Sequence, residues 1–387
     1  MGEEAGKAFE RAENLSEDRD QLVAAIEGRM IACHLAARWS VIHDLAAQRE
    51  SARVESSSRD GANDDFALLA AEASLFSSEG VPRREWLREL ASTERLPSRT
   101  RLRAAVLLAI LADNFFEADL LQSAFSTSLE LLDSGDGTPE ESLLHTIVHA
   151  TVGARELATA ALQRMILHAR STPDFSWRLL GLRRSAEASM RIGDPTSALE
   201  YAIESAELSR KLKLPLQESL SLERLVSISV SLGRINEAFE YRRQLDQVAL
   251  GGEACATITR TRLISDAKIA WATGDVALAS IVTETARTIE PSPVPRAEQT
   301  LLAIRQSAGL LTGQAVGSTP QLARLRELCR MGARFGDQDF AVSVLLESLR
   351  QSGDRSSAGR IRSRYVRTSR LETHPLPMCF PGLRASV

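Results

Sequence analysis

The 387-residue sequence has few of the patterns that build β-sheets or membrane spans. Alternating β-branched or aromatic runs are nearly absent, and Asp-Gly hairpin signals occur only at 60–61 and 136–137. Aromatic residues make up 5% of the chain. No apolar run approaches the roughly 20 residues that a transmembrane helix needs. These absences argue against an all-β fold and against a membrane-spanning helix.

Cysteine is also scarce. The four cysteines, at positions 33, 255, 329 and 379, lie far apart and form no CxxC pair. Such spacing predicts buried thiols in a reducing compartment rather than disulfides or a metal site. The acidic N-terminus lacks the apolar segment of a secretory signal. We therefore expect a cytoplasmic protein.

Catalytic and cofactor motifs are missing as well. The sequence contains no GxSxG or HExxH, and its one Gly-Lys pair, Gly6–Lys7, is followed by Ala8 rather than the hydroxyl residue of a Walker A loop. His145 and His149 have the i, i+4 spacing of helical metal ligands, but no third ligand is evident, which favours a packing or surface role. The sequence predicts a non-enzyme without a cofactor or metal.

The segment 133–142 superficially suggests a calcium loop, but its acidic residues lack the alternate-position spacing of an EF-hand. Thr138 and Glu141 instead have the spacing of a capping box, with Pro139 at the first helical position. We predict that a helix begins here.

Charge is distributed unevenly, although the net charge is only −4. Residues 1–20 carry seven acidic residues against three basic ones, and residues 350–387 carry eight arginines against two acidic residues. The basic end could contact an anion, nucleic acid or acidic partner, or it could be the solvated cap that closes a repeat array. We favour the cap, because Tyr365 is the sole aromatic residue within the basic segment 359–370. The candidate anion contacts are Arg360, Arg362, Arg364, Arg367 and Arg370.

What the sequence does contain is a repeat. Ala, Leu, Arg and Glu recur at i, i+3, i+4 spacing, which is typical of amphipathic helices, almost throughout. Glycines punctuate this pattern at intervals of 39–41 residues, and a small residue follows each of them five positions later. The glycines are Gly153, Gly193, Gly233, Gly274, Gly313 and Gly353; the small residues are Ala158, Ala198, Ala238, Ala279, Ser318 and Ala358. Weaker equivalents of the glycine are Asp113 (followed by Ala118), Gly80 and Arg38.

Each such glycine has a direct physical interpretation. A helix often ends with a left-handed glycine just past its last turn. Asp194 can then cap the next helix, with Pro195 at its first position. The small residue lets the two antiparallel helices approach closely. We therefore call each glycine a corner residue, which joins a first helix (A) to a second helix (B).

A single hairpin cannot bury its apolar face, so the hairpins must stack. The sequence predicts an all-α, right-handed superhelical solenoid of about nine ~40-residue helix-turn-helix repeats. Degenerate helical repeats with the acidic segment occupy residues 1–98, regular repeats occupy 99–370, and an irregular proline-containing tail occupies 371–387.

"GDPTSALEYA" (193–202) and "GRINEAFEY" (233–241) resemble the turn and B-helix start of tetratricopeptide repeats (TPRs). The period is near 40 rather than about 34, and Leu182, Ala186 and Ser189 stand where A-helix signature residues are expected. Longer, degenerate repeats of this kind resemble the C-terminal sensor regions of MalT-like, LuxR-family and SARP-type bacterial regulators. The resemblance covers residues 100–370 well and 20–100 weakly.

This resemblance implies a protein- or peptide-binding scaffold or sensor in bacterial regulation. The alternative is a nucleic-acid-associated transcriptional activator that uses the basic C-terminal helix. In such a stack the A helices line a concave groove, where large or polar residues would have no packing role. The candidate partner contacts on this face are Arg103, Arg183, Glu187, Glu223, Ser227, Lys268 and Trp271. The ligand, the pathway and the oligomeric state are left open.

Overall fold

The computed structural model is helical throughout the part of the chain that it describes. It describes residues 2–16, 18–36, 38–54, 63–74, 84–115, 117–132, 138–152, 154–171, 175–248, 254–289, 295–314, 319–330 and 336–369. These residues form nineteen α-helices and include no strand. In chain order the helices are α1 (Gly2–Leu15), α2 (Arg19–Leu35), α3 (Trp39–Val54), α4 (Asn63–Ser74), α5 (Arg84–Ser92), α6 (Ser98–Phe115), α7 (Ala118–Leu132), α8 (Pro139–Val152), α9 (Arg155–Ser171), α10 (Phe175–Ile192), α11 (Pro195–Lys211), α12 (Pro215–Ser231), α13 (Ile235–Gln247), α14 (Ala254–Thr273), α15 (Val276–Thr288), α16 (Pro295–Leu311), α17 (Thr319–Arg330), α18 (Gly336–Gln351) and α19 (Arg355–Ser369).

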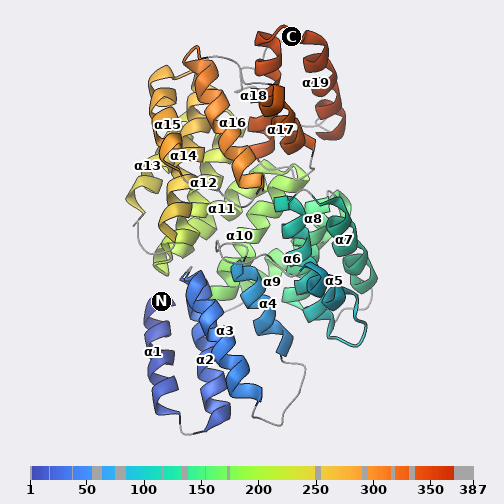
Figure 1. Cartoon of the computed structure of the whole chain (residues 1–387), viewed down its shortest axis with the longest axis vertical. Coiled ribbons are helices and arrows are strands. Elements are labelled where there is room, and N and C mark those ends of the chain that lie inside the picture. The colour runs from blue at the N-terminus through green and yellow to red at the C-terminus, as the bar shows by residue number, and fades with distance from the viewer. Residues whose placement is uncertain are drawn as a thin grey trace.

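Consecutive helices pair as hairpins, and the hairpins stack in sequence order (Figure 1). From α6 onward, each even-numbered helix is the A helix of a hairpin and the next odd-numbered helix is its B helix. Every A helix also packs on the A helix of the following hairpin. The chain is therefore an all-α solenoid of TPR-like helical repeats, as the glycine spacing predicts.

The predicted corner residues have the backbone conformation that the sequence implied. Five of them have φ between 72° and 82°, and in each case the next residue donates a backbone hydrogen bond of 2.8–3.1 Å to the carbonyl five positions earlier. A Cβ on any of the five would meet no atom within 4 Å. Glycine is therefore required for its left-handed φ and not for space. The five are Gly193, Gly233, Gly274, Gly313 and Gly353.

The small residues five positions after the corners are buried where A and B helices meet. Ala158, Ala198, Ala238 and Ala279 are each at most 1% exposed, and Ala358 is 7% exposed. Gly153 and Ser318 lie outside the described residues, although Ala154 makes the expected backbone bond to the His149 carbonyl at 2.9 Å. The predicted close approach of the paired helices is confirmed at the described positions.

The helix starts also follow the sequence. The side chain of Asp194 accepts a hydrogen bond from the Ser197 amide at 3.1 Å, with Pro195 beginning the helix. Thr138 and Glu141 exchange reciprocal hydrogen bonds of 3.2 Å between side chain and backbone amide at the start of α8. This capping box confirms the structural interpretation of 133–142, of which the structure describes the part from Thr138.

The corner assigned to Asp113 is wrong. Asp113 lies inside α6, which continues to Phe115, and the corner bond runs instead from the Glu117 amide to the Ala112 carbonyl at 3.1 Å. Ala118, expected at a helix contact, is exposed at the start of α7. Counting back 40 residues failed here because this repeat is shorter. For the weaker marks, the Arg38 amide donates to the Cys33 carbonyl at 2.9 Å, the bond made by the residue after a corner, so the prediction of Arg38 as the corner residue misses by one position. Gly80 lies outside the described residues.

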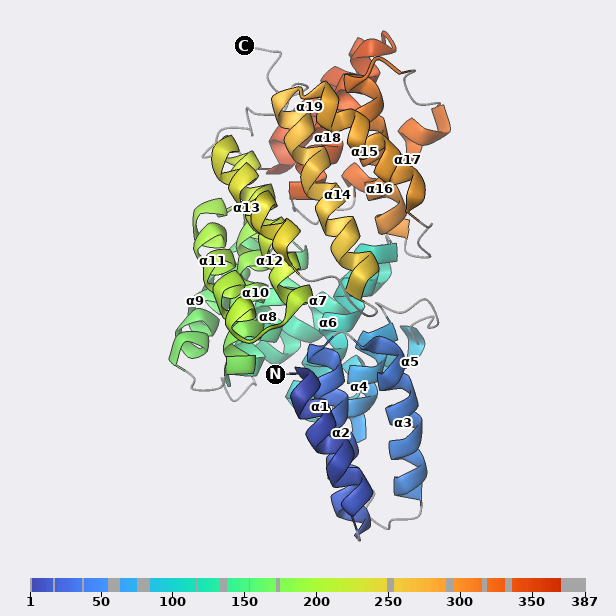
Figure 2. The same ribbon diagram turned by 90° about the vertical axis from the view of Figure 1, so that its left-hand side faces the viewer.

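The stack curls back on itself, so that helices far apart in the sequence touch. Helix α16 packs against α6, and α18 packs against α12. Figures 1 and 2 show the C-terminal helices stacked over the middle of the molecule, with α1–α3 at the opposite end. A helices from different parts of the array consequently contact one another across the coil.

The N-terminal helices join the middle of the array through a common apolar cluster. Ile26 and Met30 of α2 and Leu69 and Ala73 of α4 belong to the same buried cluster as Met190 of α10. Helix α1 covers α2, and its Phe9 ring lies so close to Gly28 that a Cβ there would clash at 2.3 Å. We call the boundary between α2–α4 and the A helices α6, α10 and α12 the seam.

Candidate functional site

The seven predicted groove residues fall into two sets. Three have partly exposed side chains and four are buried in the interior. The partly exposed residues are Arg103, Arg183 and Glu187, and the buried ones are Glu223, Ser227, Lys268 and Trp271.

Lys268 of α14 is 1% exposed, and its ammonium group is held by α12. Its Nζ donates to Glu223 Oε1 at 3.0 Å and to Ser227 Oγ at 2.6 Å. Ser227 in turn donates to Glu223 Oε1 at 2.6 Å. A charge removed from water needs such partners, and here they connect two successive A helices.

Trp271, also 1% exposed, makes a longer connection. Its indole Nε1 donates to Ser343 Oγ of α18 at 2.8 Å, and the Ser343 hydroxyl donates to the Phe340 carbonyl at 2.7 Å. The expectation that large or polar residues on this face lack a packing role is therefore wrong for Lys268 and Trp271. Lys268 connects α14 to α12 by hydrogen bonds, and Trp271 connects α14 to α18.

The partly exposed residues belong to a charged cluster at the seam. The cluster is organised by Arg184, which lies beside Arg183 on α10. Its guanidinium pairs with Glu187 at 3.1 Å and with Glu72 of α4 at 3.6 Å. His34 of α2 approaches Glu72 at 3.5 Å. The side chains of these four residues are 11–22% exposed, so the network is partly accessible to solvent.

Three more arginines act on this network. Burial alone would raise the pKa of Glu72, but His34, Arg184 and Arg103 of α6 outweigh it and hold that pKa well below its usual range. Burial and then the like charge of Arg184 lower the pKa of Arg183 to about 10, against the opposing effect of Glu187 and Glu72; Arg224 of α12 lowers it further. Arg103, Arg183 and Glu187 thus share one electrostatic environment.

Arg103 reaches this environment from a different repeat position than Arg183. In the repeat of Arg103, the corner bond is donated by Glu117, which lies 14 residues after the arginine. In the repeat of Arg183, it is donated by Asp194, which lies 11 residues after the arginine. Arg184, Glu72 and Arg224 are not among the residues predicted from the sequence. Arg184 was identifiable as a neighbour of Arg183, but Glu72 precedes the regular repeats and no periodic signal connects it to α10.

His145 and His149 occupy a buried site between α7 and α8. The Ser128 hydroxyl lies 2.8 Å from His145 Nδ1 and 2.7 Å from His149 Nε2. One hydroxyl proton serves one imidazole, so the other ring must donate to the serine oxygen. Burial lowers the pKa of both histidines to about 4, with the neighbouring His149 and Arg164 adding to the effect on His145. The pair packs as neutral rings, as its sequence context favoured.

The basic C-terminal helix is α19. Arg360 is exposed and donates to Ser357 Oγ at 2.8 Å on its own helix, while Arg362 is partly exposed. The side chains of Arg364 and Arg367, together with Arg370 and the predicted tail 371–387, lie outside the described residues. At the other end, Glu10 and Glu13 of α1 pair with Arg29 at 3.4 and 2.8 Å, so part of the acidic segment is used internally.

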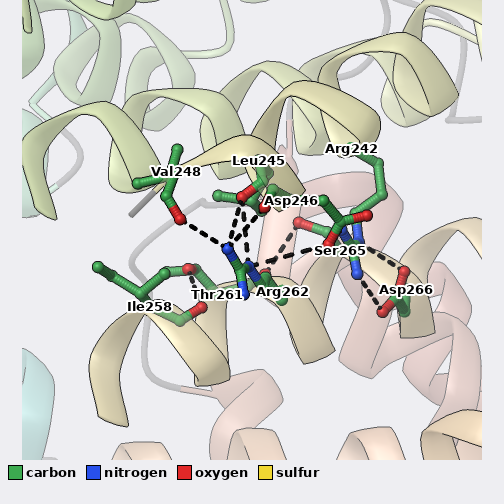
Figure 3. Close-up of polar contacts among 9 residues, drawn as sticks. All are labelled: Arg242, Leu245, Asp246, Val248, Ile258, Thr261, Arg262, Ser265 and Asp266. Carbon is green, nitrogen blue, oxygen red and sulfur yellow. Dashed lines mark hydrogen bonds and ion pairs between the residues drawn. The ribbon is translucent and has the colours of Figure 1, made fainter. Parts of the chain in front are cut away.

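Arginines also bond to the backbone near the C-terminal ends of helices, most fully between α13 and α14 (Figure 3). Arg262 of α14 donates to the carbonyls of Leu245, Asp246 and Val248 at 2.8–3.2 Å. Beside it, Arg242 forms a bidentate pair with Asp266, at 2.6 and 2.8 Å. Unpaired carbonyls at a helix C-terminus favour cations. The same device recurs where Arg101 donates to the Ala91 carbonyl and Arg305 to that of Ala286.

Within the described part of the chain, no group of three or more His, Cys, Asp or Glu residues is arranged to hold a metal ion. None of the described helices combines the length and apolar character that crossing a membrane requires. Cys33, expected to be a buried thiol, is buried and forms no disulfide.

No protein-family model matches the chain, and no curated protein sequence is significantly similar to it. Among solved structures, it is similar to a signal transduction ATPase with numerous domains (STAND) protein with a tetratricopeptide repeat sensor from Pyrococcus horikoshii, at 12% identity and a TM-score of 0.42. The similarity covers 86% of this chain and 53% of that one, so the chain spans about half the length of this relative. Similarity at this level assigns no function.

Proposed function

We propose that the chain is a non-catalytic protein- or peptide-binding module that acts in bacterial regulation. The observation that carries the proposal is the charged cluster at the seam. There, Arg103, Arg183 and Glu187 keep partly exposed side chains, whereas Glu223, Ser227, Lys268 and Trp271 are buried. Charges that remain accessible between two packed parts of a molecule are suited to recognising a polar partner.

The solenoid architecture supports this proposal. Stacked hairpins present a long surface built from many helices, which repeat proteins use to bind extended partners. The sequence resemblance to the sensor regions of bacterial regulators adds the regulatory context. In this proposal Glu223, Ser227, Lys268 and Trp271 hold the A helices in place and contribute to binding by fixing the surface.

The test is capture of a partner from an extract of the source organism, with quantification of each captured protein. The full-length wild-type chain is compared with the charge swap Arg183→Glu/Glu187→Lys, which leaves the net charge unchanged. The matched control is the swap Glu240→Lys/Arg243→Glu on the exposed face of α13, where the original pair is 47% and 70% exposed.

A genuine partner should be recovered equally by the wild type and the α13 control, and about tenfold less by the seam swap, because paired charges at an interface each contribute a kcal/mol or more. Equal recovery of every captured protein by the seam swap would refute the assignment of the surface.

A direct nucleic-acid role rests on one different observation. Helix α19 contains five arginines and no acidic residue. Binding of this kind releases counterions and therefore weakens steeply with salt. A gel shift that is lost in Arg360→Glu/Arg362→Glu and falls with salt would support this role. A salt-insensitive shift, or none, would exclude it.

A further inference from the structure

The last four A helices close into a ring. Helix α12 packs on α14, α14 on α16 and α16 on α18, as successive repeats do, and α18 also packs back on α12. We call these four helices the closed ring. All four contribute to one buried apolar cluster, in which Val226 of α12 and Phe340 of α18 are each at most 1% exposed. The chain itself therefore fills the inner face of these repeats.

One hydrogen bond spans the ring. Trp271 of α14 donates through Nε1 to Ser343 Oγ of α18 at 2.8 Å, past the intervening repeat. The bond from Gln306 of α16 to Ser348 of α18, at 3.3 Å, joins successive A helices instead. The Trp271–Ser343 bond and the packing of α18 on α12 thus belong to closure of the ring and not to the stacking of neighbouring repeats.

Closure is separable from the contacts that hold each repeat in the stack. If α18 moved away from α12 and Trp271, it would keep its packing on α16, α17 and α19. Repeat arrays derive their stability from contacts between neighbours, so this movement leaves every hairpin folded. Water can replace each partner of the closing hydrogen bond, which limits the net free energy that the bond adds to the closed form.

Helix α18 lies on the face that the A helices of an open array present to a partner. Repeat proteins bind extended partners on such faces, and an amphipathic helix is one common form of ligand. Helix α18 contributes Phe340 to the apolar cluster and, three positions later, offers the Ser343 hydroxyl to the Trp271 indole. Residues three positions apart share one face of a helix. A competing helix must supply the same two groups at the same spacing.

We propose that α18 is an autoinhibitory helix, which covers the inner face of α12 and α14 until an amphipathic helix of a partner protein displaces it. The partner helix carries a large apolar residue and, one turn away, a side-chain oxygen that accepts the hydrogen bond from Trp271. This inference goes beyond the proposed function, because it adds a second binding face outside the seam and makes access to that face depend on opening of the ring.

The test uses the purified full-length chain and a fluorescent synthetic peptide with the sequence of α18, residues 336–351. A vacated face should accept this helix from solution, and fluorescence anisotropy measures its binding. The comparison peptide carries Phe340→Asp and Ser343→Ala, which remove the apolar side chain and the hydrogen-bond acceptor. Circular dichroism and urea unfolding verify that each protein variant is folded.

Two serine variants of the chain are compared with the wild type. Ser343→Ala removes the acceptor within the chain, so the ring opens more often and the apparent affinity for the α18 peptide should rise about fivefold. Ser307→Ala is the matched control, because Ser307 is buried on α16 and its hydroxyl donates to the Ile304 carbonyl of its own helix at 2.8 Å. This control should bind the peptide as the wild type does. In a Trp271→Phe background, which lacks the donor, Ser343→Ala should give no gain in affinity.

Each outcome is decisive. Tighter binding of the α18 peptide by Ser343→Ala than by the wild type and Ser307→Ala, with loss of binding by the comparison peptide, supports the proposal. It is overturned if the α18 peptide does not bind Ser343→Ala, if the two serine variants bind it equally, or if the two peptides bind alike. A gain in affinity that persists without the Trp271 indole also overturns it. These variants leave the charges of the seam unchanged, so failure here is distinct from failure of the capture experiment.

Discussion

Lys268 on α14 donates a hydrogen bond of 3.0 Å to Glu223 on α12, and the two side chains are 1% and 10% exposed. In an ion pair this deeply buried, the Coulomb attraction largely offsets the free-energy cost of removing the two charges from water. Its value to the protein is therefore positional, because it fixes the register of two adjacent A helices.

Removing one partner of the pair should be strongly destabilising. Lys268→Met leaves Glu223 buried beside Ser227 without its cation, and we expect the free energy of unfolding to fall by about 3–5 kcal/mol. The double variant Lys268→Met/Glu223→Leu replaces the pair with apolar side chains and should recover most of that loss. Urea unfolding of the two single variants and the double variant measures the coupling. Additive effects would contradict the described pairing.

A corner glycine should be sensitive to substitution for its backbone alone. Gly233 has φ of 73° and open space around the position of a Cβ. Gly233→Ala should therefore cost about 1–2 kcal/mol, the penalty of a left-handed alanine. The matched control is Gly359→Ala in α19, where a Cβ also meets nothing within 4 Å and φ is not positive. That variant should be neutral or stabilising by roughly 0.5–1 kcal/mol, because alanine suits a helix interior. Thermal unfolding compares them, and equal destabilisation of both variants would contradict the prediction.

Stability should fall as the pH is lowered through the range of the buried histidines. Their pKa in the folded protein is about 4, below the ordinary value of 6.5, so the unfolded chain binds more protons between these limits. Their contribution is complete above about pH 6.5 and decreases as the pH falls towards 4. We expect a loss on the order of 3 kcal/mol for each histidine over that interval.

The measurement is urea unfolding at intervals between pH 7.5 and pH 5, where most carboxylates remain ionised. The variant His145→Gln/His149→Gln, which keeps polar side chains near Ser128, should show a flatter profile over this range. A wild-type profile as flat as that of the variant would show that the histidines do not titrate as described.

The C-terminal end of α13 should depend on Arg262. Its guanidinium donates to three backbone carbonyls there. A hydrogen bond that involves a charged group contributes about 1.5–3 kcal/mol to stability. Arg262→Met should raise amide hydrogen exchange in the last turn of α13 while leaving α10 and α11 unchanged. Arg243→Met, which removes an exposed arginine from α13 itself, is the control. Unchanged exchange at the end of α13 would show that the arginine does not stabilise it.

The features that could be predicted from the sequence are local ones. A left-handed glycine, an aspartate cap and a small residue at a helix contact act within a few positions of one another, so Gly193, Asp194 and Ala198 could be interpreted directly. Asp113 was misassigned because the prediction extended a fixed period of 40 residues backwards from Gly153, the first of the regular glycines. The Glu117–Ala112 corner bond shows where the period changes.

The interior could not be predicted in the same way. The bond from Trp271 to Ser343 joins residues 72 positions apart, and the pair of Glu72 and Arg184 joins a degenerate region to a regular one. No periodicity encodes such contacts, because they depend on how tightly the array curls. The sequence around a lysine on an A helix has the same pattern whether the curled array buries its side chain or leaves it exposed.

The contacts of α16 with α6 and of α18 with α12 have a consequence for how this protein can change in length. An open array tolerates the loss or duplication of one hairpin, since each unit touches its immediate neighbours alone. Here a hairpin gained or lost between α6 and α18 would shift the later helices relative to the ones they meet across the coil. Growth and shortening are therefore compatible with this architecture at its two ends, and the middle must evolve by substitution.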